Sequence, residues 1–216
     1  MSTARERTVY LNGKMLPESK ALISIHDQGF VNGDAVFDVT RTFRHEIFKL
    51  SEHIDRLFDS VTYLRIKLEL TKADMIELTH KVLDSNIHLL DHNDDYWVMH
   101  RVSRGIPTVD GHKPTVVIEC RPLPWERAKL YKQGVEIITP SVRRTPPESV
   151  SPRAKIHNYV NMILADLEVK SRNPSGWPVL LDYTGNLCEG TNSNIFLVKN
   201  GEVFTPRSQM VLGGIS

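Results

Sequence analysis

The sequence has few cysteines, almost no net charge and no long apolar run. Its 216 residues include two cysteines, Cys120 and Cys188, with neither a CxxC pair nor a Cys/His metal spacing, which argues against a disulfide framework and a zinc module. The 27 Lys+Arg and 26 Asp+Glu residues give a net charge of +1, so nucleic acid and anionic membranes are poor default partners. No apolar run reaches the roughly 20 residues that would span a bilayer.

What the sequence does contain is typical of a folded enzyme or binding module. Hydrophobic residues make up 40% and charged residues 25% of the chain, as in ordinary globular proteins. The length corresponds to one or two domains at roughly 150 residues each. The stretch from Met1 to Arg7 is polar, and we see in it neither an export signal nor a membrane anchor. We therefore expect a reducing, cytoplasmic location.

Turn residues and apolar spacing predict mixed α and β structure in the first half. Asn12-Gly13 lies between two β-rich segments and predicts a hairpin. A second hairpin is expected from 35–43 and 47–50, with an irregular loop over 25–34 between the two hairpins. Helical spacing predicts a helix that carries Arg56 after an N-cap at Ser51, and a second helix over 70–88 that begins at Thr71. Strands are expected over 96–102 and 115–119.

The second half reads as a separate lobe. Residues 121–134 contain two prolines and end in glycine, which favours a linker between lobes. The predicted organisation is a small α+β lobe over 1–121, a linker over 122–134 and a second lobe over 135–216. Within the second lobe we expect a helix from about His157 to Lys170 and strands over 135–139, 179–183, 194–198 and 203–205.

Two polar segments of the second half could carry chemistry. Lys155 lies just ahead of an apolar helical pattern, and a lysine whose amine pKa is lowered can attack a carbonyl, although most lysines are solvated surface charges. The segment Leu187–Asn194 places Glu189, a glycine and four small polar side chains between two predicted strands. Taken alone, it is better explained as a polar hairpin turn.

Five segments taken in order resemble one enzyme family. They are Ile25–Gly29, His53–Leu57, Lys155 with Asn158 and Tyr159, Glu189–Asn194, and Leu212–Ser216. Together they are similar to the class IV, or fold type IV, pyridoxal-phosphate aminotransferases. That family includes branched-chain and D-amino acid aminotransferases, (R)-selective amine aminotransferases and aminodeoxychorismate lyase. The resemblance implies a two-lobed α/β (α+β) fold with a small N-terminal α+β lobe and a larger, β-rich C-terminal lobe.

The resemblance assigns the chemistry of the cofactor to three residues. Lys155 would form a Schiff base with pyridoxal 5′-phosphate and then transfer a proton during the reaction. Glu189 would pair with the pyridine nitrogen and keep the ring an electron acceptor. Tyr159 would hydrogen-bond the ring O3′, although core packing explains this tyrosine nearly as well.

The same resemblance assigns the cofactor phosphate to three other residues. Arg56 would bind it through its guanidinium fork. The backbone amides of Ile215 and Ser216, together with the Ser216 hydroxyl, would complete the phosphate cup. Family members continue for several tens of residues beyond this motif, so we expect the second lobe to be incomplete here.

The substrate is read less specifically. Phe37, Arg41 and Trp97 fall on predicted strands and would form an apolar wall with one cation. This composition suits an amino acid with a hydrophobic side chain. The resemblance implies transfer of the amino group of an amino acid, most readily a branched-chain one, to 2-oxoglutarate, and it implies a homodimer. D-amino acid or (R)-amine transfer, the lyase reaction and a non-catalytic fragment or interaction module remain alternatives. The histidines are scattered, so we expect no metal site.

Overall fold

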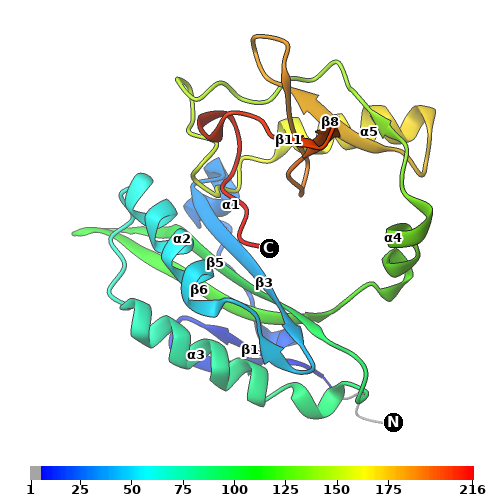
Figure 1. The fold of residues 1–216 in the computed structure, drawn as a ribbon. Helices are drawn as coiled ribbons and strands as arrows, with labels where there is room; N and C mark the ends of the chain where they lie inside the picture. Colours follow the sequence, from blue (N-terminus) through cyan, green and yellow to red (C-terminus); the bar gives the residue numbers. More distant parts are fainter. Residues whose placement is uncertain (1–5) are drawn as a thin grey trace. The chain divides into compact units, whose positions relative to one another are not determined.

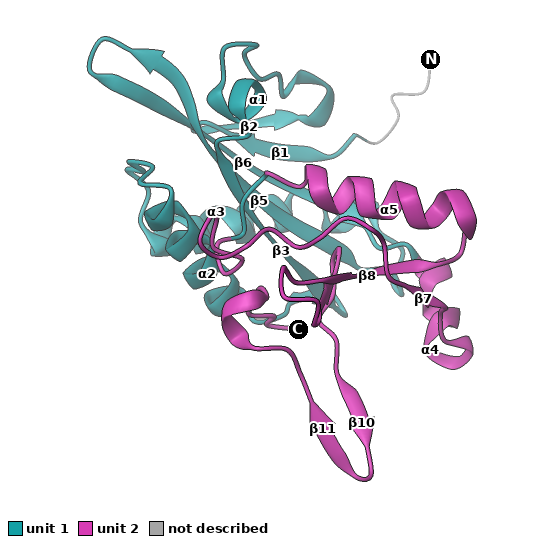
Figure 2. Ribbon diagram, turned by 90° about the horizontal axis from the view of Figure 1, so that it is seen from above, with its two compact units in different colours: residues 1–124, 155–157 teal, residues 125–154, 158–216 magenta. Residues whose placement is uncertain are grey.

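The computed structural model describes residues 6–216, and the polar stretch 1–5 lies outside the described residues. The chain divides into two compact units. Unit 1 comprises residues 1–124 and 155–157, and unit 2 comprises residues 125–154 and 158–216 (Figure 2). A three-residue segment of the second half therefore belongs to unit 1. The lobe boundaries proposed from the sequence stay a prediction.

Unit 1 is built on an antiparallel six-stranded sheet with the strand order β2-β1-β6-β5-β3-β4. Its strands are β1 (Thr8–Leu11), β2 (Lys14–Pro17), β3 (Ala35–Phe43), β4 (Glu46–Ile47), β5 (Tyr96–Thr108) and β6 (Gly111–Pro122). The first predicted hairpin is confirmed, because Asn12 and Gly13 adopt φ of 48° and 88° and join β1 to β2. The second is confirmed between β3 and β4.

Two helices, α2 (Leu50–Tyr63) and α3 (Lys72–Asp84), contact the sheet of unit 1 (Figure 1). Thr71 begins α3 as predicted and forms a capping box with Asp74. The predicted N-cap of α2 at Ser51 is wrong. The helix begins one residue earlier, at Leu50, after Lys49 in a left-handed conformation and without a side-chain cap.

Alternation along β3 and β5 sorts their side chains onto two faces. On one face most side chains are buried, as at Val36, Val98 and Val102. Ile54 and Leu57 of α2 are fully buried as well, as expected for a helix that contacts β3. Because successive strand residues point to opposite faces, Phe37 and Arg41 lie on the other face. Phe37 and Arg41, which the sequence assigns to the substrate, therefore lie on the sheet face opposite the core of unit 1.

The segment predicted as an irregular loop between the hairpins contains a short helix, α1 (Gln28–Asn32). Asp27 is its N-cap and accepts a hydrogen bond from Gly29 N at 2.7 Å. Gly33 ends the helix at a φ of 69°, a conformation that glycine adopts without strain. The two glycines of this segment therefore serve a capped helical turn, which the sequence interpretation missed. Short 3₁₀ segments occur at Glu18–Lys20 and Ile87–Leu89.

Unit 2 contains two small sheets and two helices. Its elements are α4 (Leu130–Gln133), β7 (Ile137–Ile138), α5 (Val160–Arg172), β8 (Trp177–Leu181), β9 (Leu187–Gly190), β10 (Leu197–Lys199) and β11 (Glu202–Phe204). Strands β7, β8 and β9 form one sheet, and β10 and β11 form a hairpin that extends from the rest of the unit (Figure 2). Met162, Ala165 and Leu180 form a small core between α5 and β8.

Several predicted element boundaries in this half are wrong. The segment 122–134, whose role as a linker stays a prediction, contains regular structure: its start belongs to β6, and residues 125–133 form a 3₁₀ segment followed by α4. Helix α5 begins at Val160 and not at His157, because 155–157 pair with β3 instead. The predicted strand over 135–139 is only the two residues of β7.

Residues 6–216 contain no helix that is both long and apolar enough to cross a bilayer. Within the same residues there is no cluster of three or more histidine, cysteine or acidic side chains that could hold a metal ion.

Candidate functional site

Lys155 is held in unit 1 by main-chain hydrogen bonds to β3. Its carbonyl oxygen accepts from Phe37 N at 3.0 Å, and His157 N donates to Ala35 O at 2.8 Å. Ile156 between them forms an antiparallel bridge with Val36. The segment 155–157 thus extends the sheet beside β3. The Lys155 Nζ atom lies 4.5 Å from the centroid of the Phe37 ring, a cation–π distance.

Ser60 connects Lys155 to helix α2. The Ser60 hydroxyl accepts a hydrogen bond from Lys155 N at 3.0 Å and donates to the Arg56 carbonyl at 2.9 Å. Ser60 is buried, with 1% of its surface exposed. The main chains of two predicted site residues, Lys155 and Arg56, are therefore joined through one buried side chain. Sequence reasoning missed Ser60, whose only signal is its place one helical turn after Arg56.

The Arg56 guanidinium donates hydrogen bonds to the buried carboxylate of Asp38. Asp38 accepts from Arg56 Nε at 2.7 Å and from Arg56 Nη2 at 2.8 Å, and its third hydrogen bond, at 2.7 Å, comes from His53 Nδ1. Because a carboxylate only accepts, this contact makes Nδ1 the protonated ring nitrogen of His53. Burial alone would raise the pKa of Asp38, but the hydrogen bonds from His53 and Arg56 outweigh it and hold the pKa below its ordinary value.

The predicted substrate residues share the face of the sheet opposite α2. The register pairs Phe37 with Arg101 and Arg41 with Trp97 across β3 and β5, and directly opposed residues point to the same face. Arg41 is already engaged: its Nη2 lies 3.5 Å from Asp95 Oδ2, and its guanidinium carbon lies 3.9 Å from the Phe43 ring centroid. Arg101 was missed, although it follows Trp97 at the even spacing of one strand face.

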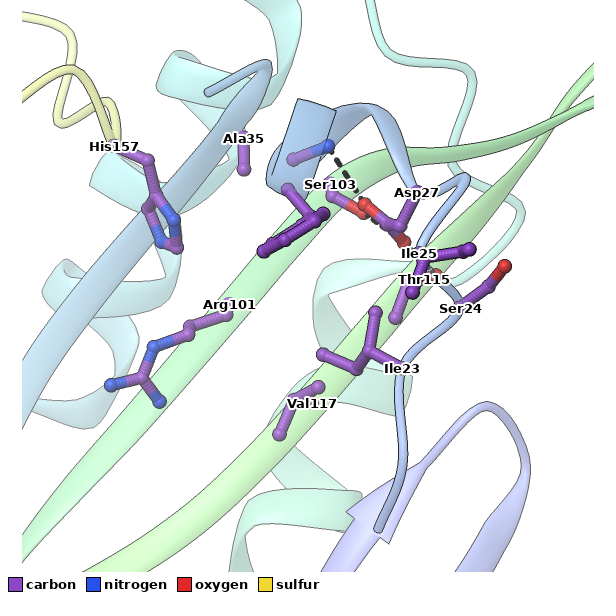
Figure 3. A pocket seen from close by; sticks show the side chains of 12 residues that line it. Ile23, Ser24, Ile25, Asp27, Ala35, Arg101, Ser103, Thr115, Val117 and His157 are labelled. Carbon is purple, nitrogen blue, oxygen red and sulfur yellow. Dashed lines mark hydrogen bonds between the residues drawn. The ribbon is translucent and has the colours of Figure 1, made fainter. Parts of the chain in front are cut away.

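A pocket of about 300 Å³ lies in unit 1 beside this face. Arg101 and His157 line one end, and Asp27, Ser103 and Thr115 line the other (Figure 3). Asp27 is 2% exposed and accepts from the Ser103 hydroxyl at 2.9 Å and from the Thr115 hydroxyl at 2.6 Å. Burial, followed by the nearby Arg101 charge, lowers the pKa of His157 to about 4. His157 is therefore neutral at physiological pH, and the cation among these residues is Arg101, whose guanidinium is paired with the buried carboxylate of Glu119.

Glu189 lies on strand β9 of unit 2. The polar segment around it is thus partly a strand, not only a hairpin turn. Glu189 is 4% exposed; its Oε1 accepts from Arg144 Nε at 2.5 Å and its Oε2 accepts from Leu212 N at 3.0 Å. Arg144 N in turn donates to Leu181 O of β8 at 2.9 Å. A carboxylate has lone pairs for further donors beyond these two.

The end of the chain lies beside Glu189. Besides the Leu212 N contact, Leu212 O accepts from Asn194 Nδ2 at 3.0 Å. A Cβ on Gly214 would approach Asn194 Oδ1 to 2.0 Å, so a larger residue there would displace the Asn194 side chain. Ile215 and Ser216 follow directly, the first partly buried and the second exposed. The structure therefore brings the Glu189–Asn194 and Leu212–Ser216 motifs together in unit 2.

Two other residues of unit 2 have structural contacts. Tyr159 precedes α5 and packs against the small core of Met162, Ala165 and Leu180. Cys188 is buried, and its thiol is 2.9 Å from Met210 O. Burial, followed by the charge of Glu189, raises the pKa of Cys188 to about 12. It is therefore a thiol at neutral pH and a poor nucleophile.

Solved structures of branched-chain aminotransferases have the same fold. The enzyme from Escherichia coli superposes with a TM-score of 0.88 at 23% identity, over 98% of this chain and 71% of that chain. The enzyme from Thermobaculum terrenum, described as the PLP-form or holo-form, gives a TM-score of 0.81 at 24% identity, over 97% of this chain and 70% of that chain. The expectation of a fold type IV architecture is confirmed.

Curated relatives are enzymes of more than one activity. A putative branched-chain-amino-acid aminotransferase of Methanocaldococcus jannaschii is 38% identical over 96% of this chain and 71% of its own length. Aminodeoxychorismate lyase of Bacillus subtilis is 33% identical, covering 92% and 67%, and D-alanine aminotransferase of Bacillus licheniformis is 26% identical, covering 96% and 71%. The family model described as Amino-transferase class IV matches residues 35–216. The chain therefore belongs to the class IV aminotransferase family.

Proposed function

We propose that this chain is a pyridoxal-phosphate-dependent aminotransferase that transfers the amino group of an amino acid, most readily a branched-chain one, to 2-oxoglutarate. Lys155 would attach the cofactor covalently through its amine. One observation carries the proposal: Ser60 joins the main chains of Lys155 and Arg56 at 3.0 and 2.9 Å in unit 1. A reactive amine and a guanidinium fork are thereby held by one local framework.

The donor set fits this cofactor. Arg56 offers a guanidinium whose fork suits a phosphate, and Lys155 offers an amine for an aldehyde. Glu189 is a buried carboxylate with two donors already in place and capacity for the protonated ring nitrogen. When bound, pyridoxal phosphate supplies an aldehyde and a ring that accepts electrons from the substrate α-carbon.

Each residue then has a task that its own atoms can perform. Lys155 Nζ takes the proton from the α-carbon of the amino substrate and later returns one, so the same amine is tether and acid/base. Arg56 would bind the cofactor phosphate, and the main-chain amides of Ile215 and Ser216 and the Ser216 hydroxyl would also donate to it. Glu189 would keep the proton on the ring nitrogen. Tyr159 would donate its hydroxyl to the ring O3′.

The far face of the unit 1 sheet supports an α-carboxylate substrate with an apolar side chain. Phe37 and Trp97 supply the apolar surface, and Arg41 supplies a cation at the β4 end of the sheet. Arg41 already contacts Asp95, so the substrate carboxylate must compete with Asp95 for the Arg41 guanidinium. Arg101, opposite Phe37, places a second guanidinium on the same face, and because it pairs with Glu119, a second carboxylate of the acceptor must compete with Glu119 for it.

The proposal includes a homodimer in the cytoplasm. Exposed apolar side chains around α1, among them Ile25 and Phe30 at 72% and 76% exposure, support association with a second copy. Cys120 and Cys188 are free thiols, which suits a reducing compartment. Light scattering coupled to gel filtration tests the dimer, because a monomeric mass at micromolar concentration would contradict it.

Transamination itself is tested by donor and acceptor assays. The protein, loaded with pyridoxal phosphate, is mixed with 2-oxoglutarate and L-leucine, L-valine, D-alanine or an (R)-amine, and glutamate is measured. We expect the branched-chain donors to be fastest and Lys155→Ala to abolish glutamate formation. Lys170→Ala is the matched control, because Lys170 pairs with Asp166 on the surface of α5. Preference for D-alanine or the (R)-amine would reassign the substrate, and no activity with any donor would contradict the proposal.

A second candidate is the lyase reaction, favoured by the 33% identity to aminodeoxychorismate lyase over 92% of the chain. It uses the same cofactor and lysine but ends in elimination. Release of pyruvate from aminodeoxychorismate in the absence of any oxo acid would identify it. Glutamate formation from L-leucine without pyruvate release would exclude it in favour of transamination.

A further inference from the structure

The carboxylate of Asp38 is fully buried yet ionised. None of its residue surface is exposed, and the hydrogen bonds from His53 and Arg56 keep its pKa low despite burial. A lone buried charge would be costly, but three donors at 2.7 to 2.8 Å compensate it. No role in binding or catalysis falls to Asp38 in the chemistry described above.

We propose that Asp38 is a positioning residue that sets the orientation of the Arg56 guanidinium for the cofactor phosphate. This inference rests on the proposed function, in which Arg56 binds that phosphate. Asp38 Oδ2 holds Arg56 Nε and Oδ1 holds Nη2, so the plane of the guanidinium is fixed by two bonds. These two bonds therefore set the orientation of the whole guanidinium relative to Asp38.

A fixed fork matters because phosphate recognition by arginine is geometric. A guanidinium donates two parallel hydrogen bonds only when its plane is aligned with the oxygens. An unrestrained arginine side chain has many rotamers, and ordering it on binding costs affinity. Asp38 removes that cost before the ligand arrives, and His53 in turn fixes the Asp38 carboxylate from the preceding turn of α2.

The same chain offers a matched control in Asp34 and Arg104. Arg104 Nε donates to Asp34 Oδ2 at 2.5 Å and Nη2 donates to Oδ1 at 3.2 Å, the same fork as in Asp38 and Arg56. Asp34 directly precedes β3 but is more exposed, at 26% of its side chain. Arg104 is directed to the carbonyls of Leu64 and Arg65 and has no proposed ligand.

The test compares affinities for pyridoxal 5′-phosphate and for pyridoxal, which lacks the phosphate. Both dissociation constants are measured by absorbance titration for the wild type, Asp38→Asn and Asp34→Asn. The dissociation constant for pyridoxal, divided by the dissociation constant for pyridoxal 5′-phosphate, measures what the phosphate contact alone adds to the affinity. We expect this ratio to fall about tenfold or more in Asp38→Asn, as for residues that orient a ligating side chain. In Asp34→Asn it should stay within about twofold.

Arg56→Gln separates this inference from the proposed function. A ratio that falls in Arg56→Gln but not in Asp38→Asn would overturn the positioning role and leave Arg56 as the phosphate ligand. A ratio unchanged in Arg56→Gln would contradict the phosphate role itself. A purely structural Asp38 would weaken both ligands in equal proportion, which leaves the ratio unchanged and also overturns the inference.

The double variant Asp38→Asn with Arg56→Gln covers the case in which Asp38→Asn alone fails to fold. Removing both charges leaves no unpaired buried ion. If Asp38 acts through Arg56, the double variant and Arg56→Gln should have the same ratio. A further fall in the double variant would show that Asp38 acts on the phosphate without Arg56, which contradicts the proposal.

Discussion

Unit 1 and unit 2 differ in how well their helices are buried against their sheets and in how many histidines they contain. Unit 1 buries much of helix α2 against a six-stranded sheet, with Ile54 and Leu57 fully buried. Helix α5 of unit 2 leaves Leu164 and Leu167 at 50% and 60% exposure, and its largest sheet has three strands. All nine histidines of the chain lie in unit 1, and residues 125–154 and 158–216 contain none.

This difference applies to the residues that the proposal assigns to the cofactor. Lys155 and Arg56 are attached to the better-packed unit through Ser60 and Asp38. Glu189 depends on Arg144 and one main-chain amide in the unit with the smaller core. Because local stability follows buried contacts, we expect Glu189 to be lost from its native position before Arg56 is.

The largest effect is expected from truncating a core leucine in unit 1. Leu57→Ala removes a fully buried side chain and should lower the free energy of unfolding by about 2 to 5 kcal/mol. Leu164→Ala in α5 removes one that is 50% exposed and should cost only about 0.5 kcal/mol. Urea denaturation measures both. Equal losses would mean that the two units do not differ in packing as described.

The buried ion pairs give the next comparison. Asp38→Asn replaces a carboxylate with three donors and should cost about 3 kcal/mol of unfolding free energy. Glu189→Gln keeps an acceptor for Arg144 and should cost about 2 kcal/mol. Peptide-resolved hydrogen exchange should confine the second loss to unit 2. Increased exchange across β3 in Glu189→Gln would break the separation between the units.

Mild acid should weaken unit 1 alone. Burial lowers the pKa of His100 and of His157 to about 4, against about 6.5 in an unfolded chain. The unfolded state therefore binds more protons between these values, and stability is lost as the pH falls from about 6.5 to about 4. Hydrogen exchange at pH 7 and pH 5, corrected for intrinsic rates, should show β3 and β5 losing protection while α5 does not.

The variant His157→Gln checks the cause of that acid response. It removes one of the two imidazoles whose pKa is lowered to about 4 and should flatten the loss of stability between pH 6.5 and pH 4. In unit 2 the depressed pKa of Asp182 has its effect only below about pH 4. An unaltered pH profile in His157→Gln, or earlier loss of protection in α5, would contradict the assignment.

The smallest effect on stability is expected from substitutions in two turns that share the sequence Asn-Gly. Asn12-Gly13 in unit 1 and Asn200-Gly201 in unit 2 both have positive φ, with the glycines at 88° and 81°. Gly13→Ala and Gly201→Ala should each strain the turn by about 1 kcal/mol. The first should lower the global unfolding midpoint, because β1 is paired on both sides. The second should only raise exchange within 197–204, and an equal global shift would contradict this.

Local signals in the sequence predicted the elements whose stability is local. Asn12-Gly13 specified its hairpin because positive φ is cheap for those residues, and Thr71 specified the start of α3 through its own capping box. Helix α1 was missed because its cap, Asp27, is fixed mainly by Ser103 and Thr115, which are distant in the chain. His157 was read as the helix start because the pairing of 155–157 with β3 is not visible in local spacing.

The proposed site was found residue by residue but not as a network. Resemblance pointed to Lys155, Arg56 and Glu189, whereas their supports are long-range pairs. Asp38 and Arg56 are 18 residues apart, and Arg144 and Glu189 are 45 residues apart. Each of these supports is an ordinary strand or loop residue in the sequence. Asp38 and Arg144 gain a role only in the folded chain, where β3 lies against α2 and β9 lies beside the loop that carries Arg144.

The most direct test of the central claim is chemical mapping of the cofactor lysine. The protein is incubated with pyridoxal 5′-phosphate, reduced with borohydride, digested and mapped by mass spectrometry. The account predicts one phosphopyridoxyl group, on the peptide that contains Lys155. A folded protein that carries no adduct, or carries it only on other lysines, would contradict the account.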